Sequence, residues 1–296
     1  MTRAPAVWRG RGEGSSSGMN ATAPDTHTTE HPLALVTGAS SGIGRELARE
    51  FAEHGYDVVV TAEDASIHQA AAELDGADGV HVEAVQVDLR DPEGVKELWR
   101  RVTDGGRRLD AVALNAGVGA GGEFADDTRL PDELSIVDLN VRSTVHLAKL
   151  VSGQMAHQGS GRILFTSSIA STMPGTYQAV YNASKSFVQS FALALREELS
   201  DRGVSVTSLM PGPTDTEFFE RADMLDTKVG AGEKDDPADV AHDGFEALMN
   251  GDERVVSHSF RTRLQGRMSR VMPDSVKASM HRRMAEPGSA DPEKES

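Results

Sequence analysis

The sequence predicts an α/β fold, a doubly wound parallel sheet with helices on both faces, in a single domain. Short apolar strands alternate with amphipathic helical segments from His31 onward, and this alternation is typical of a parallel sheet covered by helices. The strands are continuous β-branched runs, as expected where both faces of a sheet are buried. No internal repeat or linker interrupts residues 31–260.

Six strands and two helices can be assigned in chain order from these patterns. The strand segments are LALVT, DVVVT, VEAVQVD, DAVALN, RILFTS and VSVTSLM, at residues 33–37, 57–61, 82–88, 110–115, 162–167 and 204–210. Apolar residues recur at helical spacing in residues 43–55, after the first strand, and in residues 92–106, after the third. These two helices therefore connect successive strands of the sheet.

The composition limits the classes of function. With 296 residues, 38% of them hydrophobic, the chain can bury a sizeable core without disulfides or metals. The absence of cysteine excludes disulfides, thiolate metal sites and cysteine nucleophiles, and it leaves the redox compartment undetermined. A formal charge of −16 repels nucleic acid and anionic membranes, so we expect neither as a general partner. The longest apolar runs are far shorter than the ~20 residues that a membrane-spanning helix needs.

A glycine-rich turn joins the first strand to the first helix. The segment TGASSGIG, residues 37–44, has glycines at 38, 42 and 44, which let the backbone turn sharply and approach another group closely. The helix start that follows offers free N–H groups and the positive end of its dipole, which suits a pyrophosphate. A tight turn without a ligand is the alternative, but the order strand, turn, helix favours a dinucleotide site.

Two further segments fall where a dinucleotide would need them. Asp88 and Leu89 follow the third strand, where the Asp can accept a hydrogen bond from an adenine amino group. Asn115, Ala116 and Gly117 follow the fourth strand, where small residues allow a ribose to pack against the backbone. Ligands in such folds bind beyond the carboxyl ends of the strands. Because an Asp after a strand is usually only a cap, the prediction depends on all three segments together.

With these motifs the sequence resembles the short-chain dehydrogenase/reductase family, which has a Rossmann-like fold. The resemblance is carried by TGASSGIG, NAG (115–117), Asn140 in DLNV, Ser168 in FTSSIA, YNASK (181–185) and PGPTDT (211–216), in family order and spacing across residues 33–250. Alone, a Tyr-x-x-x-Lys pair or a strand-end serine would be an ordinary surface or capping group. Their joint occurrence implies reversible hydride transfer between NAD or NADP and a carbonyl or alcohol.

The resemblance also implies catalytic roles for four residues. Tyr181 is the general acid in carbonyl reduction and the base in alcohol oxidation. A free tyrosine has a pKa of about 10, and we expect Lys185, one helical turn later, to lower it as a nearby cation. In the family this lysine also binds the nicotinamide ribose. Ser168 holds the substrate oxygen against Tyr181, and Asn140 helps to hold a water that links Lys185 to solvent.

The implied cofactor contacts extend over several segments. Pro211, Gly212 and Thr214 lie at the nicotinamide carboxamide, and Thr216 near the pyrophosphate. Glu63 stands where members that prefer NADP often have Arg, which predicts a weak preference for NAD; the usual NAD-selecting Asp, however, would fall at position 62, which is Ala. No metal site is expected. The full predicted cofactor set is Gly38, Ser40, Ser41, Gly42, Ile43, Gly44, Glu63, Asp88, Leu89, Asn115, Ala116, Gly117, Tyr181, Lys185, Pro211, Gly212, Thr214 and Thr216.

Substrate selectivity is expected from two segments near the catalytic residues. Residues 171–177 follow the predicted serine, and residues 217–230 form a predicted lid with an apolar inner face. A surface amphipathic helix is the alternative for the second segment. A largely apolar carbonyl or alcohol would fit this pocket. Its predicted residues are Ser168, Met173, Tyr177, Phe218 and Phe219.

The two ends of the chain differ from the domain between them. Residues 1–30 are rich in Gly, Ser, Thr and Pro and lack the apolar stretch of a signal peptide, so we predict a disordered extension, with Met19 as an alternative start. Residues 31–258 are the predicted catalytic domain. Residues 259–284 form a basic segment with Leu264, Met268, Val271 and Met272 at near-helical spacing, and residues 285–296 a disordered tail.

The basic segment has three interpretations: an amphipathic helix on a membrane surface, a contact with a partner subunit, or packing on its own acidic domain. We favour packing on its own acidic domain.

Two other functions also remain open. One is reduction of 3-oxoacyl thioesters, in which the basic segment could meet an acidic carrier protein. The other is a non-catalytic dinucleotide-binding regulator, which would need no proton donor. Family members are commonly dimers or tetramers, so we expect a homodimer or homotetramer, in the cytoplasm.

Overall fold

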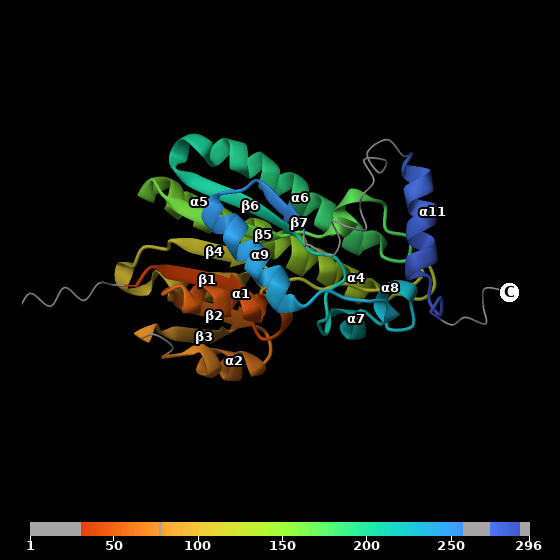
Figure 1. The fold of residues 1–296 in the computed structure, drawn as a ribbon, viewed down its shortest axis with the longest axis horizontal. Coiled ribbons are helices and arrows are strands. Elements are labelled where there is room, and N and C mark those ends of the chain that lie inside the picture. Colours follow the sequence, from red (N-terminus) through yellow and green to blue (C-terminus); the bar gives the residue numbers. More distant parts are fainter. Residues whose placement is uncertain (1–30, 77–78, 257–272, 291–296) are drawn as a thin grey trace, which may run out of the picture. The chain divides into compact units, whose positions relative to one another are not determined.

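The computed structural model describes residues 31–76, 79–256 and 273–290 (Figure 1). Within this part of the chain, seven parallel strands form one sheet in the order β3-β2-β1-β4-β5-β6-β7. The order reverses at β1, which pairs with both β2 and β4. The predicted doubly wound sheet is therefore confirmed. The strands are β1 (Leu33–Thr37), β2 (Asp57–Ala62), β3 (Val82–Gln86), β4 (Ala111–Leu114), β5 (Gly161–Thr166), β6 (Val204–Met210) and β7 (Arg254–Val256).

Helices cover both faces of this sheet. On one face α3, α5 and α6 share a buried cluster with the sheet, through side chains such as Leu98, Val151 and Val188. On the other face α1, α2 and α9 do the same, and α1 and α9 lie side by side (Figure 1). The helices are α1 (Gly42–Glu53), α2 (Ser66–Leu74), α3 (Pro92–Thr103), α4 (Leu130–Ile136), α5 (Thr144–Gln158), α6 (Ala179–Leu199), α7 (Phe218–Arg221), α8 (Lys228–Ala231), α9 (Pro237–Asn250) and α11 (Asp274–Ala285).

The two cores explain why the strands are apolar without alternation. In β1, Leu35 belongs to the cluster under α3, α5 and α6, whereas its neighbours Ala34 and Val36 belong to the cluster under α1, α2 and α9. Successive side chains of a strand point to opposite faces, so a strand covered on both sides is apolar at every position. The sheet is held between the two helix layers by these contacts.

The strand β7 was not predicted, and several boundaries differ from the sequence prediction, most of them by one to three residues. The third strand ends at Gln86 rather than at residue 88. The predicted tail begins too early, because residues after α11 are still attached to the domain: Gly288 N donates to Asp226 Oδ2 (2.6 Å) and Ala290 N donates to Asp226 O (3.0 Å). The predicted extension 1–30 and the apolar positions Leu264, Met268, Val271 and Met272 lie outside the described residues.

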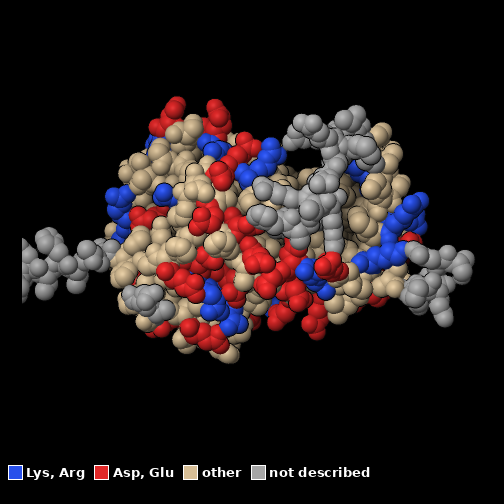
Figure 2. Space-filling model, viewed as in Figure 1, with Lys and Arg blue, Asp and Glu red and all other residues tan. Residues whose placement is uncertain are grey.

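Acidic residues dominate the face of the domain shown in Figure 2; basic residues are scattered over it, some of them at the end where α11 lies. Lys277 and Arg282 of α11 are paired with Asp274 (3.1 Å) and Glu286 (3.5 Å). Much of the basic character of this helix is therefore neutralised locally. Among the described residues, no helix combines the length and the apolar character needed to cross a membrane.

Candidate active site

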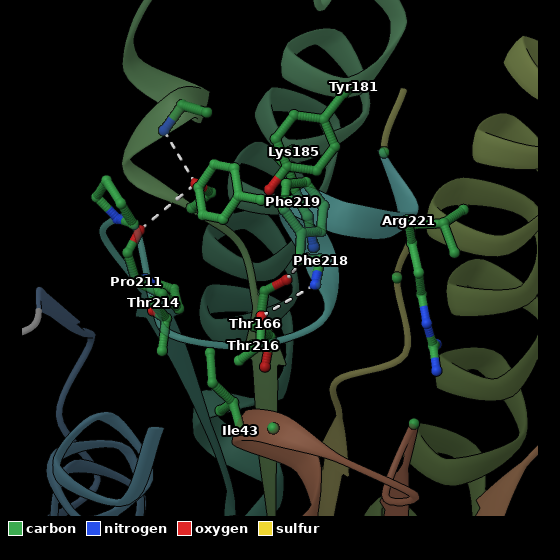
Figure 3. A pocket seen from close by; sticks show the side chains of 18 of the residues that line it. Ile43, Thr166, Tyr181, Lys185, Pro211, Thr214, Thr216, Phe218, Phe219 and Arg221 are labelled. Carbon is green, nitrogen blue, oxygen red and sulfur yellow. Dashed lines mark hydrogen bonds between the residues drawn. The ribbon is translucent and has the colours of Figure 1, made fainter. Parts of the chain in front are cut away.

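A pocket lies beyond the carboxyl ends of β1, β4, β5 and β6 (Figure 3). Its walls come from residues 38–44, 115–119, 166–173 and 211–221, the segments that follow these strands. Doubly wound folds bind ligands at this edge, where the strand order reverses. The predicted site residues that line it are Gly38, Ser40, Ser41, Gly42, Ile43, Gly44, Glu63, Asn115, Ala116, Gly117, Ser168, Met173, Tyr181, Lys185, Pro211, Gly212, Thr214, Thr216, Phe218 and Phe219.

The turn between β1 and α1 has a shape that only glycine allows. Gly42 has a φ of +55°, and a Cβ there would lie 2.7 Å from Cγ2 of Thr216. A Cβ on Gly38, at φ +66°, would lie 2.8 Å from Cα of Ala116. Ser41, the residue before α1, makes no capping bond with its side chain. The first N–H groups of α1 are therefore not bonded to the Ser41 side chain, and the glycines leave no side chain in front of them. This arrangement suits the binding of a pyrophosphate.

Asn115 ties together the ends of three strands. Its Nδ2 donates to the carbonyl oxygens of Thr37 (3.2 Å) and Gly38 (3.3 Å), and its Oδ1 accepts from Oγ1 of Thr166 (3.0 Å). These bonds use the side chain within the protein. Asn115 therefore acts on the pocket by holding the glycine turn in position, and its neighbours Ala116 and Gly117 supply the open backbone surface.

The end of β2 contributes carboxylates to the same edge of the sheet. Glu63 is exposed and lines the pocket. Asp64 accepts a hydrogen bond from the hydroxyl of Ser40 (3.0 Å), so the glycine turn is tied to β2 as well as to β4. Negative charge at this point disfavours an additional phosphate on a bound ribose.

Asp88 and Leu89, predicted to contact adenine, are not among the residues that line the pocket. Both carboxylate oxygens of Asp88 accept from Nε of Arg90, at 2.9 and 3.0 Å. Leu89 is buried in the core under α3 and α5. The Asp88 side chain is nevertheless 44% exposed, and a carboxylate can accept further hydrogen bonds, so the adenine contact stays a prediction.

Lys185 reaches the pocket from the buried side of α6. Its Nζ donates to the carbonyl oxygen of Thr166 at the end of β5, at 2.9 Å (Figure 3). Only 6% of the residue is exposed. Burial disfavours the charged form and lowers the pKa of Lys185 to about 8. The ammonium group is therefore still mostly protonated at neutral pH, yet close to its titration point.

Tyr181 lies one turn earlier on the same helix. Burial raises the pKa of Tyr181 to about 12, and a hydrogen bond with the Ser168 hydroxyl acts in the opposite direction. The expected lowering of this pKa by Lys185 is wrong for the protein without cofactor, because burial dominates. The ammonium nitrogen lies 5.9 Å from the centre of the Tyr181 ring. At neutral pH Tyr181 is thus a protonated phenol.

The two serines after β5 point to different partners. Ser168 begins a short 3₁₀ turn (Ile169–Thr172), where its Oγ accepts from Ala170 N at 3.1 Å, donates to Pro211 O at 3.4 Å and also interacts with Tyr181. The Ser167 hydroxyl instead donates to the carbonyl oxygen of Lys185 (3.1 Å). Of the two serines, Ser168 is thus the one that interacts with Tyr181, and its role toward a bound substrate stays a prediction.

Asn140 lies behind the pocket, in a π-helical turn (Val137–Ser143) between α4 and α5. Its side chain accepts from Val118 N (2.9 Å) and donates to Val118 O (2.9 Å) and to Oγ of Ser184 (3.0 Å). π-Helical turns are frequent at functional sites. Here the turn directs a fully buried amide at the loop after β4 and at α6, so it fixes these two walls relative to each other.

The chain matches known proteins over this region. Residues 32–224 match the family described as short chain dehydrogenase. The chain belongs to the short-chain dehydrogenase/reductase family. It is similar to sulfoacetaldehyde reductase 2 of Chromohalobacter salexigens, with 34% identity over 188 residues, 63% of this chain and 74% of that protein. It is also similar to serine 3-dehydrogenase of Agrobacterium fabrum, with 33% identity over 185 residues, 62% of this chain and 72% of that one. A solved short-chain dehydrogenase from Sphingobium yanoikuyae in complex with NADPH superposes with a TM-score of 0.72 at 27% identity, covering 84% of this chain and 94% of that chain.

The outer wall of the pocket of this dehydrogenase is largely apolar. The ring centres of Phe218 and Tyr181 are 5.1 Å apart, and Phe219 packs edge-on against Phe218. Because Gly119 has no side chain, Phe218 can lie this close: a Cβ there would come within 2.6 Å of the Phe218 ring. The predicted lid thus supplies two aromatic side chains to the pocket, as its apolar residues suggested.

Helix α11 contributes wall residues that sequence reasoning missed, namely His281, Met284 and Ala285. Tyr177, predicted to line the pocket, is not among the lining residues and instead holds this helix. It has a φ of +65°, and its hydroxyl donates to Oε1 of Glu286 at 3.3 Å. No local pattern pairs positions more than 100 residues apart, so the role of α11 could be found only in three dimensions. The other lining residues outside the predicted set are Val118, Gly119, Leu139, Thr166, Ser167, Ile169, Ala170, Gln178, Pro213, Glu217, Arg221 and Val229.

Proposed function

We propose that this dehydrogenase transfers a hydride between a nicotinamide dinucleotide and a largely apolar carbonyl or alcohol, with Tyr181 as the acid or base. One observation carries the proposal: a phenol that interacts with Ser168 lies one helical turn from the buried Lys185, in a pocket that also contains the glycine turn. The bound dinucleotide supplies the hydride or accepts it. A regulator without turnover would need no such proton donor.

The three side chains divide the acid–base work. The pKa of Tyr181, raised by burial to about 12, keeps the phenol protonated at neutral pH, ready to donate to a carbonyl oxygen. The Ser168 hydroxyl orients that oxygen. Lys185, with a pKa of about 8, is mostly charged at pH 7 and stabilises the phenolate that remains after the proton has moved. In the direction of oxidation Tyr181 must first lose its proton, so near neutral pH the free enzyme is in the protonation state that reduction needs.

The test is a screen of ketones, alcohols and 3-oxoacyl thioesters with NADH and NADPH. Tyr181→Phe should lower kcat by about 10²–10⁴-fold, the usual contribution of general acid–base catalysis. Tyr56→Phe is the matched control, because it removes a hydroxyl that meets Sδ of Met249 (3.7 Å) from a tyrosine that does not line the pocket. Full activity of Tyr181→Phe would show that the proposed mechanism is wrong. Turnover of thioesters but not of simple ketones would favour the carrier-linked alternative.

For the dinucleotide we propose a weak preference for NAD. Support comes from Glu63, an exposed carboxylate in the pocket wall that would repel a ribose 2′-phosphate. The solved relative from Sphingobium yanoikuyae contains NADPH, so the preference needs a direct measurement. Glu63→Arg should move kcat/KM toward NADPH, whereas a wild-type preference for NADPH of about tenfold or more would contradict the proposal.

Because the dissociable dinucleotide must come from the cell's pool, we also expect a cytoplasmic enzyme, which cell fractionation tests.

We further propose that two copies associate through the face formed by α4, α5 and α6. Support comes from partly exposed apolar side chains there: Leu134 (51%), Val137 (40%), Val145 (37%) and Phe187 (40%). Copies with a net charge of −16 repel each other, so a stable contact requires a patch of this kind. Phe187→Glu should give monomers in size-exclusion chromatography with light scattering. Phe124→Glu, on a loop outside these helices, should not.

A further inference from the structure

Helix α11 brings one imidazole into the pocket wall. His281 is 6% exposed, and its Nδ1 lies 2.9 Å from the carbonyl oxygen of Thr176. A carbonyl oxygen can only accept, so Nδ1 must carry the proton of this bond. Burial lowers the pKa of His281, which keeps the ring neutral at pH 7. In a neutral ring with a protonated Nδ1, the second nitrogen, Nε2, is an acceptor.

This acceptor has no partner among the residues that the structure describes. The one hydrogen bond of the His281 ring is the bond to Thr176, and Nε2 is not among the fully enclosed polar atoms that lack a partner. Nε2 therefore keeps some accessible surface, on a residue that lines the pocket. The side chains beside it on this wall, Met284 and Ala285, offer no hydrogen-bond donor. In the open pocket water can donate to this acceptor; a ligand that displaces the water without donating in its place leaves Nε2 unpaired, which is costly.

The imidazole is held in a defined position relative to the catalytic residues. The hydroxyl of Thr176 donates to Ala278 O (2.9 Å), so the loop before α6 is bonded to α11 on both sides of the ring. Tyr177 adds the bond to Glu286. That loop leads within one turn into the part of α6 that carries Tyr181. A ligand bound at Tyr181 thus meets an acceptor whose place is fixed by the same stretch of chain.

We propose that Nε2 of His281 accepts a hydrogen bond from the substrate, so that the pocket selects carbonyl compounds that carry a hydroxyl or amide N–H remote from the reacting carbon. The inference rests on the proposed reductase activity and adds to it the chemical class of the substrate. A lone pair attracts a donor and repels a carboxylate or sulfonate, so compounds with an anion at this end should be poor substrates. Sites built around one hydrogen bond discriminate strongly against analogues that lack the matching group.

The test compares ω-hydroxy-2-alkanones with 2-alkanones of matched and increasing chain length. At one length the wild-type enzyme should prefer the hydroxy ketone by about tenfold or more in kcat/KM, mainly through KM. His281→Asn keeps a donor for Thr176 but removes the Nε2 acceptor, and His281→Phe removes both. In each variant the preference should fall to about twofold or less; a general loss of activity would lower both series alike and leave the ratio unchanged.

His157→Asn is the matched control, because Nδ1 of His157 also meets a backbone carbonyl, that of Gly153 (2.6 Å), but on an exposed helix surface outside the pocket. An unchanged preference in His281→Asn overturns the inference, as does a wild-type enzyme that reduces both series equally at every length. These results would leave the proposed activity intact. A wild-type enzyme that reduces no ketone in either series would instead overturn the proposed function, and the inference with it.

Discussion

Lys185→Met should stabilise the cofactor-free protein at neutral pH while it removes activity. Burial lowers the pKa of Lys185 from 10.5 to about 8. At about 1.4 kcal/mol per pKa unit, this difference means that the charged form costs the fold about 3 kcal/mol. Methionine keeps a long apolar side chain but loses the bond from Nζ to Thr166, which offsets about 1 kcal/mol. The net gain in unfolding free energy at pH 7 should be about 2 kcal/mol.

The pH dependence of this gain identifies its cause. The unfolded chain keeps the proton of Lys185 up to a pKa of about 10.5, whereas the folded chain releases it near 8. The unfolded state therefore binds more protons between these values, and wild-type stability rises with pH across the window. The advantage of Lys185→Met should be full below pH 8 and should disappear as the pH approaches 10.5.

Urea unfolding of both proteins at several pH values measures the effect. Lys149→Met, at an exposed position of α5, is the control and should show no such window. A variant less stable than wild type at pH 7 would refute the reasoning. So would a stability difference that stays constant from neutral to alkaline pH, because a pure packing effect does not follow the titration of one group.

Three other predictions concern the cofactor turn, the π-helical turn and the pH profile. Gly42→Ala adds a Cβ at φ +55°, 2.7 Å from Thr216, and strain of about 1–3 kcal/mol should weaken dinucleotide binding roughly tenfold; Gly55→Ala, at φ +78° in open space, is the control, and equal dissociation constants would contradict the prediction. Asn140→Ala should lower the unfolding free energy by about 1–3 kcal/mol, because the part-buried N–H and C=O of Val118 lose their partner; a loss below about 0.5 kcal/mol in urea unfolding would count against it. Ketone reduction should slow above a pH of about 8 as Lys185 loses its proton, and a flat pH–rate profile up to pH 10 would exclude this role.

The sheet and the glycine turn could be predicted because their causes are local in the sequence. Strands buried on both faces are apolar at every position, and a turn at positive φ requires glycine wherever it occurs. The strand β7 (Arg254–Val256) escaped prediction because three partly exposed residues form no pattern. The ion pair of Asp88 with Arg90, two residues later, also has a local cause in the sequence.

Properties that arise from packing could not be read from spacing. The distance of four residues between Tyr181 and Lys185 correctly suggested one helix face, but it also suggested that the cation sets the tyrosine pKa. Burial instead raises the pKa of Tyr181. Phe218, which packs against the Tyr181 ring, contributes to this burial from a distant part of the chain. The same holds for His281, whose partner Thr176 is 105 residues away.

The π-helical turn at Val137–Ser143 makes the active site sensitive to the length of the chain in a way that no substitution reveals. Removing one residue from this turn would allow regular α-helical bonding from α4 through α5 and would therefore favour the helix as an isolated element. It would also rotate α4 against α5 by ~100°, the angle per residue of an α-helix. Asn140 would then point away from Val118, and the wall after β4 would lose its attachment to α6. The π-helical turn thus sets the rotation of α4 relative to α5. The helix is less regular as a result, but the Asn140 amide is oriented toward Val118 and Ser184.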